Sequence, residues 1–199
     1  AHGELTGILE VRALLEAQRF DGKTAGAFSI LPRGNDFEVV AAVKHARALS
    51  LWCLAALSQK LPEGNYKLAD CEPGKAALGW LLAQHRFDDY RSKGEDPKAG
   101  SRILLTGEAA RSEEVIRLAE ATVRVLDFVN TPAADLGPAE LELAVADLAK
   151  KTGAQLRVAA GDELSEGYPL IAAVGAAATS DRTARLIELE WGKAEDPRV

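Results

Sequence analysis

Short apolar segments of β type alternate with longer segments of helical periodicity along most of this 199-residue chain. Apolar residues recur at helical spacing over residues 8–18, and a nearly all-apolar stretch over residues 46–61 stops at Pro62. Two β-rich runs flank the turn-forming residues 32–36, which is the pattern of a hairpin. Strands separated by helices predict an α/β fold with substantial parallel pairing.

The rest of the chain continues this alternation. Pro138 and Gly153 have the positions expected just inside the start and just past the end of one helix. We expect Ser112 to cap another helix, the strand at 102–106 to be buried, and the polar residues 92–100 to form a surface loop. The further expected strands are 66–69, 102–106, 155–159, 170–175 and 184–191, and the further expected helices are 73–90, 113–129 and 138–151.

Composition excludes several classes of protein. The formal net charge is −6 and no dense Lys/Arg run occurs, so the sequence predicts no nucleic-acid partner. No stretch reaches the ~20 apolar residues of a membrane helix, and no secretory signal is visible, so we expect no membrane partner. Two cysteines form no disulfide framework, which favours a reducing cytoplasm. The absence of methionine, even at the first position, hints at a trimmed or partial chain.

The chemically active residues define no complete catalytic group. His2, His45 and His85 are far apart in the sequence, although His85 could share a helix face with Asp88 or Asp89. A metal site needs three or four converging ligands, so a solvated histidine is the favoured interpretation of His85. The sequence contains neither a G-x-G-x-x-G fingerprint nor a Walker lysine loop.

The cysteines and one glycine are explained by packing. Cys53 lies between Trp52 and Leu54, as a buried thiol would, and Cys71 has no paired histidine that would make it a nucleophile. Gly175 follows an expected strand, where close backbone packing is the favoured interpretation over ligand contact.

Longer strings of residues carry more information than any single position. Four strings follow one another between residues 77 and 192, whereas residues 1–75 carry none. They are Ala77-Leu78-Gly79-Trp80 with Arg86-Phe87-Asp88-Asp89-Tyr90-Arg91, then Asn130-Thr131-Pro132-Ala133-Ala134-Asp135-Leu136-Gly137-Pro138, then Gly167-Tyr168-Pro169-Leu170-Ile171-Ala172-Ala173-Val174-Gly175, and finally Ala184-Arg185-Leu186-Ile187-Glu188-Leu189-Glu190-Trp191-Gly192. In this order they resemble a helix, the junction and two strands of leucine aminopeptidases (cytosol aminopeptidases).

The resemblance implies a domain organisation. Residues 1–107 would form an N-terminal domain with a mixed sheet flanked by helices. Residues 108–129 would form a continuous interdomain helix. Residues 130–199 would be the incomplete first part of a second α/β domain, the zinc-peptidase-like catalytic domain, in which 170–175 and 184–191 belong to a largely parallel sheet.

The resemblance also implies a function for the whole protein. It would be a two-metal hydrolase with manganese or zinc that releases N-terminal amino acids from peptides in the cytoplasm, as a homohexamer. The family's metal-binding and catalytic motifs follow the strand at 184–191, beyond Val199. We therefore assign no catalytic, metal-binding or cofactor-binding residue to this chain, expect it to bind no metal, and expect it to be inactive without the remainder of the catalytic domain.

Two alternatives remain open from the sequence. One is a non-catalytic α/β module that binds a partner or a small ligand at its strand ends. The other is a stand-alone hydrolase that uses His85 with Asp88 and Asp89, for which further ligands are missing.

Overall fold

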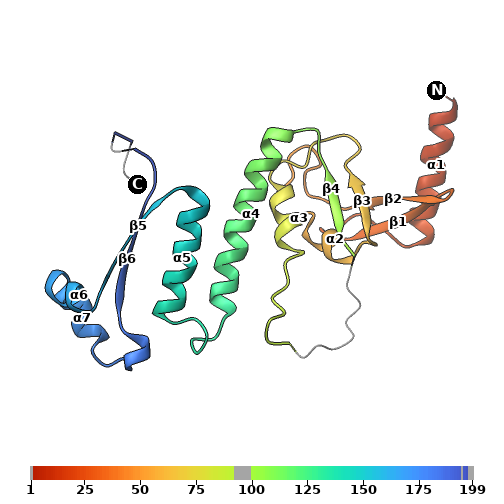
Figure 1. The fold of residues 1–199 in the computed structure, drawn as a ribbon. Helices are drawn as coiled ribbons and strands as arrows, with labels where there is room; N and C mark the ends of the chain where they lie inside the picture. The colour runs from red at the N-terminus through yellow and green to blue at the C-terminus, as the bar shows by residue number, and fades with distance from the viewer. Residues whose placement is uncertain (1, 92–99, 194, 197–199) are drawn as a thin grey trace. The chain divides into compact units, whose positions relative to one another are not determined.

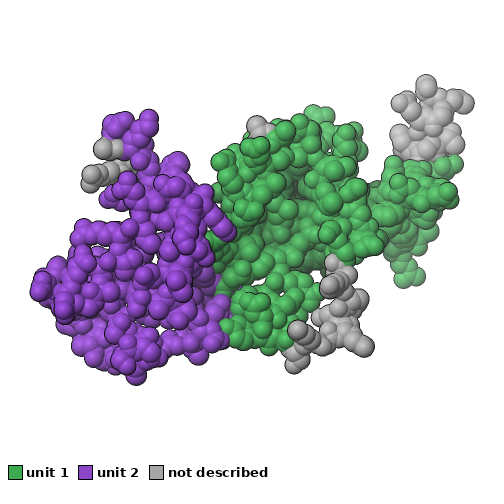
Figure 2. Space-filling model, in the orientation of Figure 1, with its two compact units in different colours: residues 1–127 green, residues 128–199 purple. Residues whose placement is uncertain are grey.

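The computed structural model describes residues 2–91, 100–193 and 195–196, and the chain divides into two compact units, residues 1–127 and 128–199 (Figure 2). The predicted α/β class is confirmed, because helices and short strands alternate along the chain (Figure 1). The predicted loop at 92–100 lies almost entirely outside the described residues.

The first unit contains α1 (His2–Ala17), β1 (Phe28–Arg33), β2 (Asp36–Ala41), α2 (Ala55–Lys60), β3 (Gly64–Lys67), α3 (Ala76–Leu82), β4 (Arg102–Leu105) and α4 (Ala109–Asn130). The last three residues of α4 belong to the second unit.

The predicted hairpin is confirmed. Strands β1 and β2 pair antiparallel, with Phe28 opposite Ala41 and Arg33 opposite Asp36. Gly34 in the turn has φ +61°, a left-handed conformation that glycine adopts without steric cost.

Strands β3 and β4 form a parallel pair, with Tyr66 opposite Leu104. The expectation that β4 would be fully buried is wrong, because Ile103 and Leu105 are about half exposed. In a strand, successive side chains point to opposite faces, and only the face that carries Leu104 packs against the core.

The core of the first unit lies where α2 and α3 pack together. Trp80 is its largest fully buried side chain, and its indole Nε1 donates a hydrogen bond to the carbonyl of Arg102 at 2.9 Å. Tyr66 packs on this indole with ring centroids 5.7 Å apart. The buried members of the cluster are Leu54, Leu57, Leu61, Ala76 and Trp80.

Two predicted helices are shorter in the structure. Only residues 55–60 of the predicted helix 46–61 are helical. The preceding residues form β-turns instead, such as the one closed by the hydrogen bond from the Cys53 N–H to the Ser50 carbonyl. The predicted helix 73–90 is helical over 76–82. Just beyond its end, the Gln84 side-chain amide pairs with both the N–H and the carbonyl of Arg102, so a tertiary contact replaces the next helical turn.

Helix α4 is continuous, as predicted for residues 113–129. The prediction that Ser112 caps it is wrong, because the helix begins at Ala109 and the Ser112 hydroxyl donates to the carbonyl of Glu108 within the helix. The Thr106 hydroxyl instead accepts the N–H of Glu108 just before the first turn.

The second unit is built on one antiparallel strand pair. The helix that starts at Pro138 ends at Gly153, whose φ of +70° is the left-handed cap predicted from the sequence. The elements of this unit are α5 (Pro138–Thr152), β5 (Gln155–Ala160), α6 (Gly161–Gly167), α7 (Pro169–Gly175), η1 (Ser180–Arg182) and β6 (Arg185–Glu190).

Across both units, none of the helices in the described ranges has the length and apolar character needed to span a bilayer.

Two expectations for this unit are wrong. Residues 170–175 form helix α7 rather than a strand, because Pro169 opens the first turn and alanines supply helix propensity. Strands β5 and β6 pair antiparallel rather than parallel, with Gln155 opposite Glu190. Gly175 packs on Ala184, since a Cβ at the glycine would lie 2.3 Å from the Ala184 Cβ.

Burial raises the pKa of Tyr66 above its ordinary value, and the nearby Arg102 opposes that shift. The neutral phenol, which donates to the carbonyl of Pro62 at 2.7 Å, is therefore favoured in the folded state. The stability that this group supplies is fully present below about pH 10, the ordinary pKa of tyrosine, and is lost as the pH rises through the folded-state pKa. We expect Tyr66→Phe to flatten the alkaline fall in the free energy of unfolding between about pH 9 and 11. Urea titrations should show this, with the exposed Tyr90→Phe as control, and an equal fall in both variants would contradict it.

Candidate functional site

The histidines named from the sequence do not converge. His45 is exposed in a loop, the side chain of His2 lies outside the described residues, and His85 pairs with Asp127 rather than with Asp88 or Asp89. Asp88 instead lies within ion-pair distance of Arg86 and Arg91.

His85 has a partner that the sequence did not indicate. Its Nε2 lies 2.8 Å from Oδ1 of Asp127, near the end of α4, in a half-buried position. The two residues are 42 positions apart, so no local spacing could have revealed the pair. One histidine and one carboxylate tether α4 to the segment after α3 but provide too few ligands for a metal ion.

One of the two cysteines has a hydrogen-bond partner on the backbone. Cys53 donates its S–H to the carbonyl of Ser50 at 3.0 Å, and both Cys53 and Cys71 are free thiols. Within the described ranges, no cluster of three or more His, Cys, Asp or Glu side chains could hold a metal ion.

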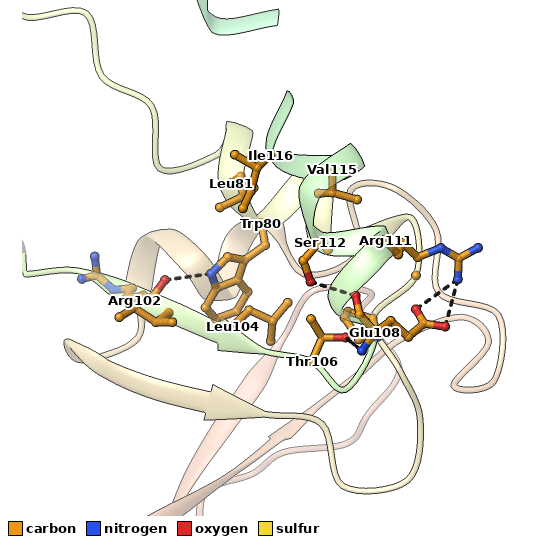
Figure 3. Close-up of a pocket in the computed structure, with 14 residues that line it drawn as sticks. Trp80, Leu81, Arg102, Leu104, Thr106, Glu108, Arg111, Ser112, Val115 and Ile116 are labelled. Carbon is orange, nitrogen blue, oxygen red and sulfur yellow. Dashed lines mark hydrogen bonds and ion pairs between the residues drawn. The ribbon is translucent and has the colours of Figure 1, made fainter. Parts of the chain in front are cut away.

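A hollow of the first unit lies between α3, β4 and α4, and Figure 3 shows its lining. Its volume is about 250 Å³. The sequence did not predict this cavity, because its walls come from three elements spread over residues 73–116 and no local pattern brings them together. Its apolar walls include Ala77, Trp80, Leu81, Leu104, Val115 and Ile116.

Thr106, Glu108, Arg111 and Ser112 lie together at one end of this lining, whereas Arg102 lies on the other side of Trp80 (Figure 3). The Arg111 guanidinium contacts both carboxylate oxygens of Glu108, at 3.3 and 3.1 Å. Both side chains are substantially exposed, Arg111 at 57% and Glu108 at 39%. The Thr106 hydroxyl donates to the Glu72 carboxylate at 2.7 Å. The cavity therefore combines an apolar interior with an exposed carboxylate and an exposed guanidinium at this end.

A second hollow, in the second unit, lies at the N-terminal end of α5. Arg182 on its wall donates to the carbonyls of Ala133 and Ala134, and Arg185 pairs with Glu142. These arginines fix the 132–137 turn and the start of β6 on α5, which is a structural role.

Comparison with known proteins agrees with the sequence resemblance. The profile of the M17 aminopeptidase N-terminal domain matches residues 9–124. A "Probable cytosol aminopeptidase" of Brucella ovis is 30% identical over 199 aligned positions, which cover 87% of this chain and 39% of the relative. Another, from Rhodococcus jostii, is 35% identical and covers 63% of this chain and 27% of the relative. The chain thus spans well under half the length of these relatives.

Solved structures show the same fold. The cytosol aminopeptidase from Coxiella burnetii matches 98% of this chain and 43% of its own length, with a TM-score of 0.80 and 26% identity. The bottromycin maturation enzyme BotP, in complex with Mn, matches 92% of this chain and 42% of its own, with a TM-score of 0.74 and 25% identity. Since the family profile covers more than half of the residues and the fold matches over nearly all of them, the chain belongs to the M17 aminopeptidase family and contains its N-terminal domain.

Proposed function

We propose that these 199 residues are the N-terminal portion of a leucyl aminopeptidase, an exopeptidase that releases N-terminal amino acids from peptides. The observation that carries this proposal is the match to cytosol aminopeptidases over 87% of the chain. In this proposal residues 1–107 are the N-terminal domain, 108–129 the interdomain helix, and 130–199 the first part of the catalytic domain.

We place the catalytic chemistry outside residues 1–199. A two-metal centre needs several carboxylates that converge on ions about 3.5–4 Å apart, and the described residues provide no cluster that fits. The role proposed for this chain is to supply the N-terminal domain and to fix the entry into the catalytic domain. Arg182 serves that role, because it holds the carbonyls of Ala133 and Ala134 in the turn before α5.

The remaining features of the proposal concern the whole protein. Its proposed metals are manganese or zinc, and metal dependence is supported by the Mn complex of the related enzyme BotP. A cytoplasmic location is supported by the names of the relatives. Peptides are its proposed substrates, and a homohexamer is its proposed assembly.

Hydrolysis of leucine-p-nitroanilide tests this proposal. We expect the full-length polypeptide that contains this segment to be active with added Mn²⁺ or Zn²⁺ and inactive after chelation, and residues 1–199 alone to be inactive under both conditions. A full-length protein without activity on any N-terminal amino-acid amide would overturn it. Activity of residues 1–199 that His85→Ala abolishes would instead support a stand-alone hydrolase.

A further inference from the structure

We propose that the cavity between α3, β4 and α4 binds a free α-amino acid with a large apolar side chain. The side chain would enter the apolar interior next to Trp80, and the ammonium and carboxylate groups would bind Glu108 and Arg111. The proposal does not depend on the peptidase activity proposed above.

The apolar walls select the side chain. The cavity volume of about 250 Å³ lies just below the roughly 300–1,000 Å³ typical of sites for drug-sized ligands, so it suits a smaller molecule. Leu81 and Ile116, which are 37% and 47% exposed, provide aliphatic contacts beside the buried Trp80, and each buried methylene of a ligand contributes about 0.8 kcal/mol. A leucine or phenylalanine side chain gains from these contacts, whereas glycine offers nothing to bury.

The ion pair selects the backbone of the ligand. Glu108 and Arg111 present opposite charges 3.1 Å apart, which complements a molecule that carries an ammonium and a carboxylate on one carbon. The pair is exposed, so exchange of one partner for a ligand group costs little, because surface ion pairs contribute only about 0–1 kcal/mol.

The full-length protein and the 199-residue chain, each labelled with 5-fluorotryptophan, provide a direct test by ¹⁹F NMR. The chain has three tryptophans, of which Trp80 lines the cavity, so L-leucine should shift the Trp80 resonance saturably and leave those of Trp52 and Trp191 in place. We expect 4-methylpentanoate, 3-methylbutylamine and glycine, which each lack one recognised group, to bind at least about tenfold more weakly.

Variants test the assigned contacts. Glu108→Gln and Arg111→Gln should each raise the dissociation constant of leucine about tenfold, since each removes a charge-assisted hydrogen bond. Ala77→Leu should block the site by filling the cavity. Arg117→Gln and Glu113→Gln, on the exposed surface of the same helix, are matched controls and should bind as the parent does.

Three results would overturn the proposal: no saturable shift of the Trp80 resonance, equal binding of 4-methylpentanoate and leucine, or unchanged affinity in both Glu108→Gln and Arg111→Gln. Because the readout is binding rather than hydrolysis, these outcomes are independent of whether the full-length protein is a peptidase.

Discussion

Replacing Trp80 with alanine should lower the free energy of unfolding of the first unit by about 3–5 kcal/mol. The indole is only 2% exposed and lies at the centre of the cluster that joins α2, α3 and β4. Truncation leaves a void among Leu54, Leu57 and Leu61, which are themselves fixed by neighbouring elements. Since a typical domain has only about 5–15 kcal/mol of stability, this change would remove a large share of it.

A second substitution separates packing from hydrogen bonding at this position. Trp80→Phe keeps an aromatic ring but removes the Nε1–H donor to the carbonyl of Arg102. That carbonyl also accepts the Gln84 amide at 3.1 Å, so it retains a partner. We therefore expect Trp80→Phe to cost much less than Trp80→Ala, since most of the ring packing remains and no buried polar group is left unpaired.

The measurement is hydrogen exchange of the amides in α3 and β4, with circular dichroism in urea as a second readout. Trp52→Ala is the matched control, because Trp52 is 58% exposed and its removal should change the stability by less than about 1 kcal/mol. Equal effects of the Trp80 and Trp52 substitutions would contradict the position of the core.

Local chemistry in the sequence predicted some elements well. The turn formers around Gly34 predicted the β1–β2 hairpin, and the Pro138 and Gly153 positions predicted both ends of α5. In each case, the deciding residue fixes its own backbone conformation, through the φ of proline or the left-handed freedom of glycine. These predictions needed no knowledge of the rest of the fold.

Other elements depend on contacts that no local pattern contains. The apolar run at 170–175 fits a buried strand or a short helix equally well by periodicity. The helix predicted over 73–90 stops at Leu82, and soon after it Gln84 binds the backbone of Arg102, 18 positions away. The His85–Asp127 pair and the cavity above Trp80 likewise join segments that are far apart in the sequence. Ordered strings of residues predicted the family, and the proposed function depends on that family rather than on any single residue.

The second large change in stability is expected for Gly79→Ala, where helix propensity and the structure predict opposite signs. Glycine inside a helix is about 1 kcal/mol less favourable than alanine, so Gly79→Ala in α3 should stabilise the protein by helix propensity alone. In the structure, however, a Cβ at this position would lie 1.8 Å from the carbonyl oxygen and 2.8 Å from the carbonyl carbon of Leu51. Both atoms are backbone, so no side-chain rotation relieves the overlap.

We therefore expect Gly79→Ala to destabilise the first unit by about 3 kcal/mol, at the upper end of typical overpacking costs. Gly167→Ala, at the end of α6, is the control, because a Cβ there meets nothing within 4 Å. Urea unfolding of both variants checks the sign: Gly167→Ala should be neutral or slightly stabilising. A stabilising Gly79→Ala would show that α3 can move away from the 49–54 segment. If α3 stays in place, the requirement for glycine comes from the close approach of the two backbones, which helix propensity does not take into account.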